Sequence, residues 1–192
     1  MISTSATLLQ RLRDRDDSAW RRLVEMYTPL VRRWLARSVP HPTDVDELAQ
    51  QVFAVIVEKF PDFEHSGRPG AFRAWLRGIS VNRLRMFWRA RPARGPDPEP
   101  ILRQLEDPHS ELTRLWDREH DEHVLRRAME LIEPEFKPAT WRAFRRVALE
   151  EAEPEAVAAD LGLTVNAVFI AKSRVLRRLR EEIDGFVDAD WP

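Results

Sequence analysis

Apolar side chains recur at three- and four-residue spacing through nearly every segment of this chain, and this periodicity constrains its fold more than any other feature. Between Ala19 and about Ser38, six large side chains form one helical stripe: Trp20, Leu23, Val24, Tyr27, Val31 and Trp34. Only 6 of the 192 residues are glycine, and no segment shows the sustained alternation of a half-buried strand. The sequence therefore predicts an all-α protein with this stripe in its core.

A proline-rich stretch separates the predicted helices into two groups. Its prolines prevent a continuous helix and favour extended backbone; they are Pro92, Pro96, Pro98, Pro100 and Pro108. We expect two small helical domains, at residues 1–92 and 111–184, joined by an acidic linker at 93–110. An acidic tail at 185–192 follows. Its Phe186 and Trp191 are expected either to fold back on a basic face or to fray.

The composition excludes several classes of protein. The chain has no cysteine, so it forms no disulfide and offers neither a thiolate zinc site nor a thiol nucleophile. No apolar run approaches the ~18 residues of a membrane span, and we expect a cytoplasmic protein without membrane insertion. His120 and His123 lie one helical turn apart, but no third ligand is indicated, so neither a metal nor another cofactor is expected.

The stretch from Phe72 to Arg94 carries seven arginines and no acidic residue. Its first apolar side chains share one helix face: Phe72, Trp75, Leu76 and Ile79. Guanidinium groups fit phosphates bidentately, and the aromatic side chains of this stretch offer flat surfaces for unpaired bases. We therefore predict that it binds single-stranded or melted nucleic acid. The alternative is a solvated basic face on a core helix.

Another predicted helix starts at Thr43 or Asp44 and carries two different faces. One face is apolar and is expected to be buried: Val45, Leu48, Val52 and Ile56. The neighbouring face combines Phe53 with acidic and glutamine side chains. Phe53 either packs against a second internal helix or is the apolar anchor of a partner site ringed by polar groups.

The segment from Glu153 to Arg180 has the spacing of a helix-turn-helix. Pro154 suits the first helical turn, Gly162 permits a left-handed turn, and Thr164 can cap the second helix. Such a unit places the start of its second helix in a major groove. Base contacts are expected from Thr164, Asn166, Ala167 and Ile170, and phosphate contacts from Lys172, Arg174, Arg177 and Arg178. Phe169 is expected to pack on a flank with Val165 and Leu176 rather than to contact a thymine methyl group. The alternative is an ordinary helical hairpin with a cationic face.

Taken in order, these segments resemble the extracytoplasmic-function sigma factors, compact bacterial initiation factors with only the second and fourth sigma domains. DVDELAQQVF is similar to the family's polymerase-binding helix, although Glu47 stands where aspartate is usual. FRAWLRGISVNRLR is similar to the helix that melts and reads the minus-ten element, and the loop from Pro61 to Gly70 corresponds to the one that holds a flipped-out base. The helix-turn-helix corresponds to the reader of the minus-thirty-five element. This chain departs from the family in having Phe169, Ile170 and Ala171 where lysine, serine and arginine are common.

The resemblance implies a transcription initiation factor, not an enzyme, that directs core RNA polymerase to a promoter and promotes strand opening. It implies contacts with the β′ clamp and β flap of polymerase and with promoter DNA, and leaves open an anti-sigma partner. The implied polymerase contacts are Asp44, Asp46, Glu47, Gln50, Gln51 and Phe53. The implied minus-ten contacts are Phe72, Arg73, Trp75, Arg77, Asn82, Arg83, Arg85 and Arg89.

Two alternatives remain open at this point. One is a helix-turn-helix regulator that acts without binding core polymerase, which would leave the basic aromatic helix unexplained. The other is a small helical hydrolase that would use Asp44, Asp46, His41 and His65.

Overall fold

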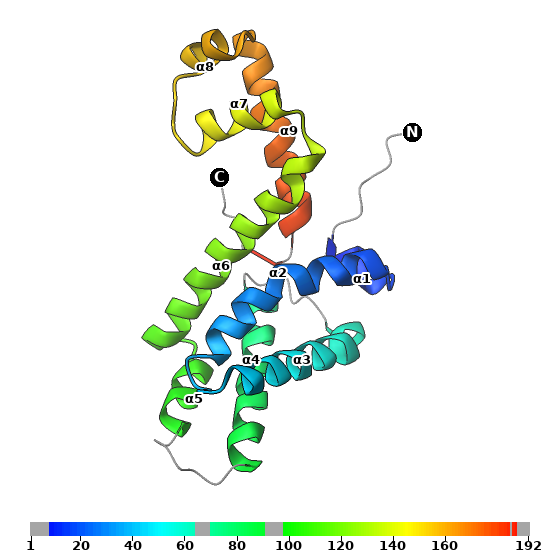
Figure 1. The fold of residues 1–192 in the computed structure, drawn as a ribbon, viewed down its shortest axis with the longest axis vertical. Helices are drawn as coiled ribbons and strands as arrows, with labels where there is room; N and C mark the ends of the chain where they lie inside the picture. The colour runs from blue at the N-terminus through cyan, green and yellow to red at the C-terminus, as the bar shows by residue number, and fades with distance from the viewer. Residues whose placement is uncertain (1–7, 64–69, 91–97, 185, 188–192) are drawn as a thin grey trace. The chain divides into compact units, whose positions relative to one another are not determined.

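The computed structural model describes residues 8–63, 70–90, 98–184 and 186–187, and these residues are almost entirely helical (Figure 1). The helices are α1 (Leu8–Arg13), α2 (Asp17–Leu35), α3 (Pro42–Lys59), α4 (Ala71–Ala90), α5 (Glu99–Glu106), α6 (Glu111–Ile132), α7 (Pro138–Ala148), α8 (Pro154–Leu161) and α9 (Val165–Ile183). Two short 3-10 helices follow α3 and α6, at Phe60–Asp62 and Glu133–Glu135. The predicted all-α class is confirmed.

The described residues form two compact units. The first unit consists of Leu8–Leu125 together with the described residues from Asp184 onward, and the second unit is Arg126–Ile183. The division falls within α6, whereas the sequence predicts that the second domain begins at residue 111. The first half of α6 and all of α5 therefore belong to the first unit.

The predicted linker is partly helical. The expectation of extended backbone is wrong for Glu99–Glu106, which form α5. Pro100 lies in the first turn of this helix, where no intrahelical bond needs its missing N–H. Leu102 and Leu105 are buried, and α5 packs against α4. The described part of the linker is thus a structural element of the first unit.

Most of the predicted core stripe on α2 is buried, as expected. Leu23, Tyr27 and Val31 are each at most 1% exposed. Val24 is an exception, since 37% of its surface is exposed. It lies on nearly the same side of α2 as the buried Val31, seven residues later, but it lines an open hollow between α2 and α3. The prediction that Val24 belongs to the core was wrong.

An aromatic cluster fills the centre of the first unit. Phe72 of α4 packs against Tyr27 of α2 and Phe186, with ring centroids 5.4 Å and 4.7 Å away, and Phe63 packs at 5.7 Å. Phe186 is only 1% exposed. The expectation that it frays or lies on a basic face is therefore wrong, because its ring completes this apolar cluster. Trp191 lies outside the described residues.

The two histidines of α6 are buried in the first unit and hydrogen-bonded there. His120 Nε2 lies 3.1 Å from the Tyr27 hydroxyl, and its Nδ1 lies 2.8 Å from an Asp121 carboxylate oxygen. His123 Nε2 donates to the Met26 carbonyl at 2.7 Å. Burial lowers the pKa of His120 although Asp121 opposes the shift, which favours a neutral ring. The described chain contains no group of three or more His, Cys, Asp or Glu side chains arranged to hold a metal ion.

The second unit is built from α7, α8 and α9, which all contact one another. Ala143, Val157 and Val168 contribute one side chain from each helix to its core. Gly162 ends α8 with a φ of 64°, the left-handed conformation that glycine adopts without steric cost. Thr164 Oγ1 then accepts a hydrogen bond from the Ala167 amide and caps α9. The chain bends by 102° between α8 and α9, within the range of helix-turn-helix pairs.

Among the described residues, no single helix is long and apolar enough to cross a membrane, and only the sharply bent pair α8 and α9 has the length and composition to do so.

Candidate nucleic-acid interface

The arginines of α4 fall into two groups with different surroundings. Arg73 and Arg77, near the start of the helix, form ion pairs with acidic side chains of α6. Arg73 Nη1 lies 2.8 Å from Asp121, and Arg77 Nη1 lies 3.1 Å from Asp117. The two arginine side chains are only 14% and 11% exposed. Both were predicted to contact DNA, but their charges are held inside the first unit by α6.

Two aromatic residues of the predicted minus-ten set also lie inward. Phe72 is buried in the aromatic cluster, so it has no surface to offer to DNA in this arrangement. Trp75 is half-buried, with its ring centroid 4.7 Å from that of Phe63. The predicted contact between Phe72 and minus-ten DNA is therefore not supported, and its role in the structure is packing. The loop residues 64–69, which include His65, lie outside the described residues.

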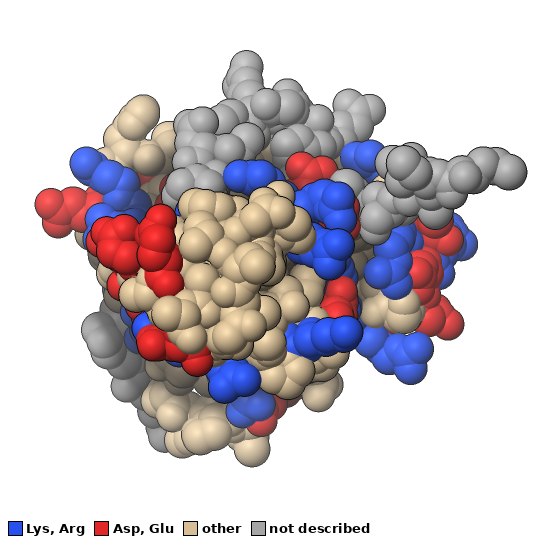
Figure 2. Space-filling model, turned by 90° about the horizontal axis from the view of Figure 1, so that it is seen from above, with Lys and Arg blue, Asp and Glu red and all other residues tan. Residues whose placement is uncertain are grey.

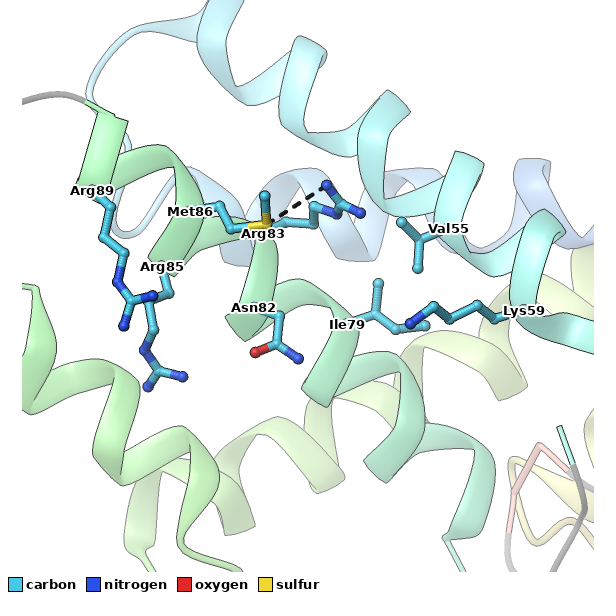
Figure 3. A pocket seen from close by; sticks show the side chains of 8 residues that line it. All are labelled: Val55, Lys59, Ile79, Asn82, Arg83, Arg85, Met86 and Arg89. Atoms are coloured by element: carbon cyan, nitrogen blue, oxygen red, sulfur yellow. Dashed lines mark hydrogen bonds between the residues drawn. The ribbon is translucent and has the colours of Figure 1, made fainter. Parts of the chain in front are cut away.

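The second half of α4 forms a basic hollow with α3, shown in Figure 3. We call this the α3–α4 hollow. Its volume is about 280 Å³, and its lining residues are Val55, Lys59, Ile79, Asn82, Arg83, Arg85, Met86 and Arg89. Val55 and Lys59 come from α3 and the other six from α4. The hollow thus gathers four cations around the Asn82 amide, which Figure 3 shows between Arg85 and Lys59.

The side chains of the α3–α4 hollow differ in their exposure and in the hydrogen bonds and ion pairs that they form with other residues. Asn82 and Arg89 are exposed, while Arg83 donates a long bond of 3.8 Å to the sulfur of Met86. Arg85 lies 2.7 Å from Glu106 and 3.6 Å from Glu99, both on α5. The hydrogen bond that Arg85 donates to Glu106 raises the pKa of Arg85. Sequence reasoning found four of the lining residues but missed Lys59, because α3 was assigned to a different surface.

A second hollow, of about 380 Å³, lies between α2 and α3 and includes part of the predicted polymerase surface. It is lined by Val24, Thr28, Arg32, Asp46, Ala49, Gln50 and Phe53. Phe53 is half-buried, and Asp46 pairs with Arg32 at 2.8 Å. Of the other predicted residues on α3, Glu47 and Gln51 are exposed and Asp44 is half-buried. The sequence analysis placed Val24 in the core and therefore missed that it lines this hollow together with Phe53.

The outward face of α9 presents the predicted base-contacting residues. Asn166, Ile170, Ser173 and Arg177 follow one another at spacings of four, three and four residues and are all exposed. Thr164 and Arg174 are also exposed, and Ala167 and Lys172 are half-buried. Phe169 is 51% exposed, so the prediction that it packs on a flank was wrong. It points about 100° away from the buried Val168 that precedes it.

Arg178 differs from the other cations of α9. It lies 2.7 Å from Glu135 and 2.9 Å from Glu182, and a second Glu135 oxygen accepts from it at 2.8 Å. These bonds place Arg178 in the framework of the second unit. The predicted phosphate contact is therefore not supported in this arrangement, whereas the neighbouring Arg177 is exposed.

Comparison with known proteins addresses the family directly. The family model described as Sigma-70 region 2 matches residues 23–93, which include most of α2 and all of α3 and α4. The chain is also 27% identical over 168 residues to RNA polymerase sigma factor HrpL from Pseudomonas syringae pv. syringae. That match covers 86% of this chain and 88% of the relative.

Proposed function

This chain belongs to the extracytoplasmic-function sigma factors, which direct bacterial RNA polymerase to promoters, and we propose that three of its surfaces divide this task. The α2–α3 hollow binds core polymerase, the α3–α4 hollow captures the opened minus-ten strand, and the outward face of α9 reads the minus-thirty-five element. The polymerase supplies the chemistry and the sigma factor supplies binding free energy. The site of action is then the cytoplasm, where polymerase and promoter DNA meet.

The observation that carries the strand-opening role is the α3–α4 hollow. Lys59, Arg83 and Arg89 can attract the phosphates of a single strand, whereas Arg85 is paired with Glu99 and Glu106 of α5. The Asn82 side chain can both donate to and accept from a base edge, whereas arginine only donates. Met86 adds an exposed apolar side chain beside them. A surface that binds unpaired bases better than paired ones shifts the duplex toward the open state.

The polymerase-binding role is supported by the α2–α3 hollow. Phe53 is a half-buried aromatic side chain with the exposed Val24 beside it and Gln50 and the Arg32–Asp46 pair around it. An apolar centre within a polar rim is the usual composition of a protein-binding surface. The β′ clamp is the proposed partner of this surface, and the β flap that of the second unit. A partner anti-sigma factor stays a prediction.

The test compares promoter opening on duplex and on pre-melted templates. Core polymerase carrying the Asn82→Ala, Arg83→Ala double variant should still form a closed complex but should lose permanganate reactivity at the minus-ten thymines. A template with a mismatched bubble should restore most of the transcription. The control is Arg118→Ala, which removes an exposed arginine of α6. Normal opening of duplex DNA by the double variant would show that the α3–α4 hollow is not the strand-capturing surface.

A further inference from the structure

Two neighbouring apolar side chains stand on the outward face of α9 without a place in the core. Phe169 is 51% exposed and Ile170 is 43% exposed. The core of the second unit is served by a different stripe of the same helix, Val168, Ala171, Val175 and Leu179. Phe169 and Ile170 follow Asn166 by about one helical turn, so the three side chains emerge on the same side of α9.

The charges around this apolar pair identify the chemistry of its partner. From Val165 to Arg180, α9 contains no acidic residue, and its exposed Arg174 and Arg177 lie one and two turns after Ile170. Figure 2, seen from the α8 end of the second unit, shows uncharged surface with basic side chains along one side and acidic side chains along the other. An apolar pair followed by cations along one helix face fits a polyanion that carries an apolar group on its surface. Duplex DNA has such a group in its major groove, the 5-methyl of thymine.

We propose that Phe169 and Ile170 recognise thymine methyl groups in the upstream promoter element. This inference rests on the proposed entry of α9 into a major groove. Asn166, one turn earlier, can bond bidentately to an adenine edge, and the apolar pair then reads thymines nearby. Arg174 and Arg177 hold the backbone phosphates. Phe169 and Ile170 are positions at which this chain departs from the family. In this proposal they determine which promoter sequence the protein prefers, through methyl contacts in place of polar contacts.

Replacing thymine by deoxyuridine removes the methyl group and leaves base pairing intact, so it isolates this contact. The full chain with core polymerase is first used to select upstream elements from a randomised library, and each thymine of the selected element is then replaced singly. Each contacted methyl should contribute about fourfold to affinity, the value expected for burying one such group. The Phe169→Ala, Ile170→Ala double variant should bind the thymine and deoxyuridine templates equally.

Matched variants separate this contact from other effects. Leu149→Ala truncates another exposed apolar side chain of the second unit, outside α9, and should keep the thymine preference. Ile170→Val keeps a branched side chain and should keep part of that preference. Thermal melting of each variant checks that the second unit still folds, and exposed positions make a large loss of stability unexpected.

The possible results distinguish the failure of this inference from that of the proposed function. If the wild-type complex selects no DNA sequence at all, the proposed promoter reading by α9 fails. If it selects an element but binds thymine and deoxyuridine equally, Phe169 and Ile170 do not read methyl groups. If the double variant instead loses association with core polymerase in the absence of DNA, the apolar pair is a protein contact and the inference is overturned.

Discussion

Replacing Arg77 by alanine should destabilise the first unit without changing the number of phosphate contacts that the protein makes. The Arg77 side chain is 11% exposed and is paired with Asp117, which is 29% exposed and also lies 3.4 Å from Arg73. Burial lowers the pKa of Arg77, and the negative charge of Asp117 opposes this shift. The ion pair therefore favours the charged form of Arg77. Removing the Arg77 guanidinium leaves the partly buried Asp117 carboxylate with one ion-pair partner fewer.

The expected magnitude follows from this partial burial. Removing one partner of a fully buried ion pair costs about 3–5 kcal/mol, and exposed pairs contribute at most ~1 kcal/mol. Water reaches part of Asp117, so we expect Arg77→Ala to lower the free energy of unfolding by about 2 kcal/mol. With a urea dependence of about 2 kcal/mol per molar, the unfolding midpoint should fall by roughly 1 M.

The matched control is Arg89→Ala, on the same helix but exposed. It should leave the urea midpoint nearly unchanged, and it should reduce by about one unit the slope of the logarithm of promoter affinity against the logarithm of salt concentration. Both variants are measured by urea unfolding and by salt titration of the polymerase–promoter complex. The reasoning is refuted if Arg77→Ala keeps the wild-type midpoint and lowers the salt slope, because Arg77 would then be a phosphate contact.

Three other predictions follow from the described contacts. Phe53→Ala combined with Gln50→Ala should abolish association with core polymerase in a pull-down; a loss of more than ~2 kcal/mol in unfolding free energy would show instead that Phe53 is a core residue. Arg177→Ala should lower the salt slope of promoter binding by about one unit, whereas Arg178→Ala should leave that slope unchanged and lower the melting temperature, because Arg178 is bonded to carboxylates of its own unit. Burial lowers the pKa of His120 in the folded state below its value of 6.5 in the unfolded chain, so the unfolded state binds more protons and stability should fall as the pH drops through about 6.5. Urea midpoints between pH 5.5 and 7.5 test this, and a smaller pH dependence is expected for His120→Gln.

Local patterns in the sequence predicted the helices and the helix-turn-helix spacing well. Leu23, Tyr27 and Val168 are buried as expected from helical periodicity. The exposure of Val24 could not be read from this pattern, because the helical angle places it within about 20° of the buried Val31 and Leu35. It is exposed because it lines the hollow between α2 and α3, which only the packing of the two helices reveals.

Long-range pairing could not be read from local patterns. The α4 arginines and the α6 acids were assigned to different domains, so the contacts of Arg73 and Arg77 with Asp117 and Asp121 were not anticipated. Helix α5 was missed because prolines were counted as helix breakers, although Pro100 occupies a first turn, where proline is favourable. The roles proposed for the site residues depend on which charges the fold leaves exposed, and only the three-dimensional arrangement supplies that information.

The buried position of Phe186 also bears on how the protein is made. Tyr27 and Phe72, which Phe186 contacts, leave the ribosome long before it, and the whole of the second unit, Arg126–Ile183, is synthesised in between. Domains generally fold in the order in which they are translated, but this first unit is discontinuous along the chain. In a growing chain, the space that Phe186 fills is left to water or to another apolar side chain until α9 has been completed.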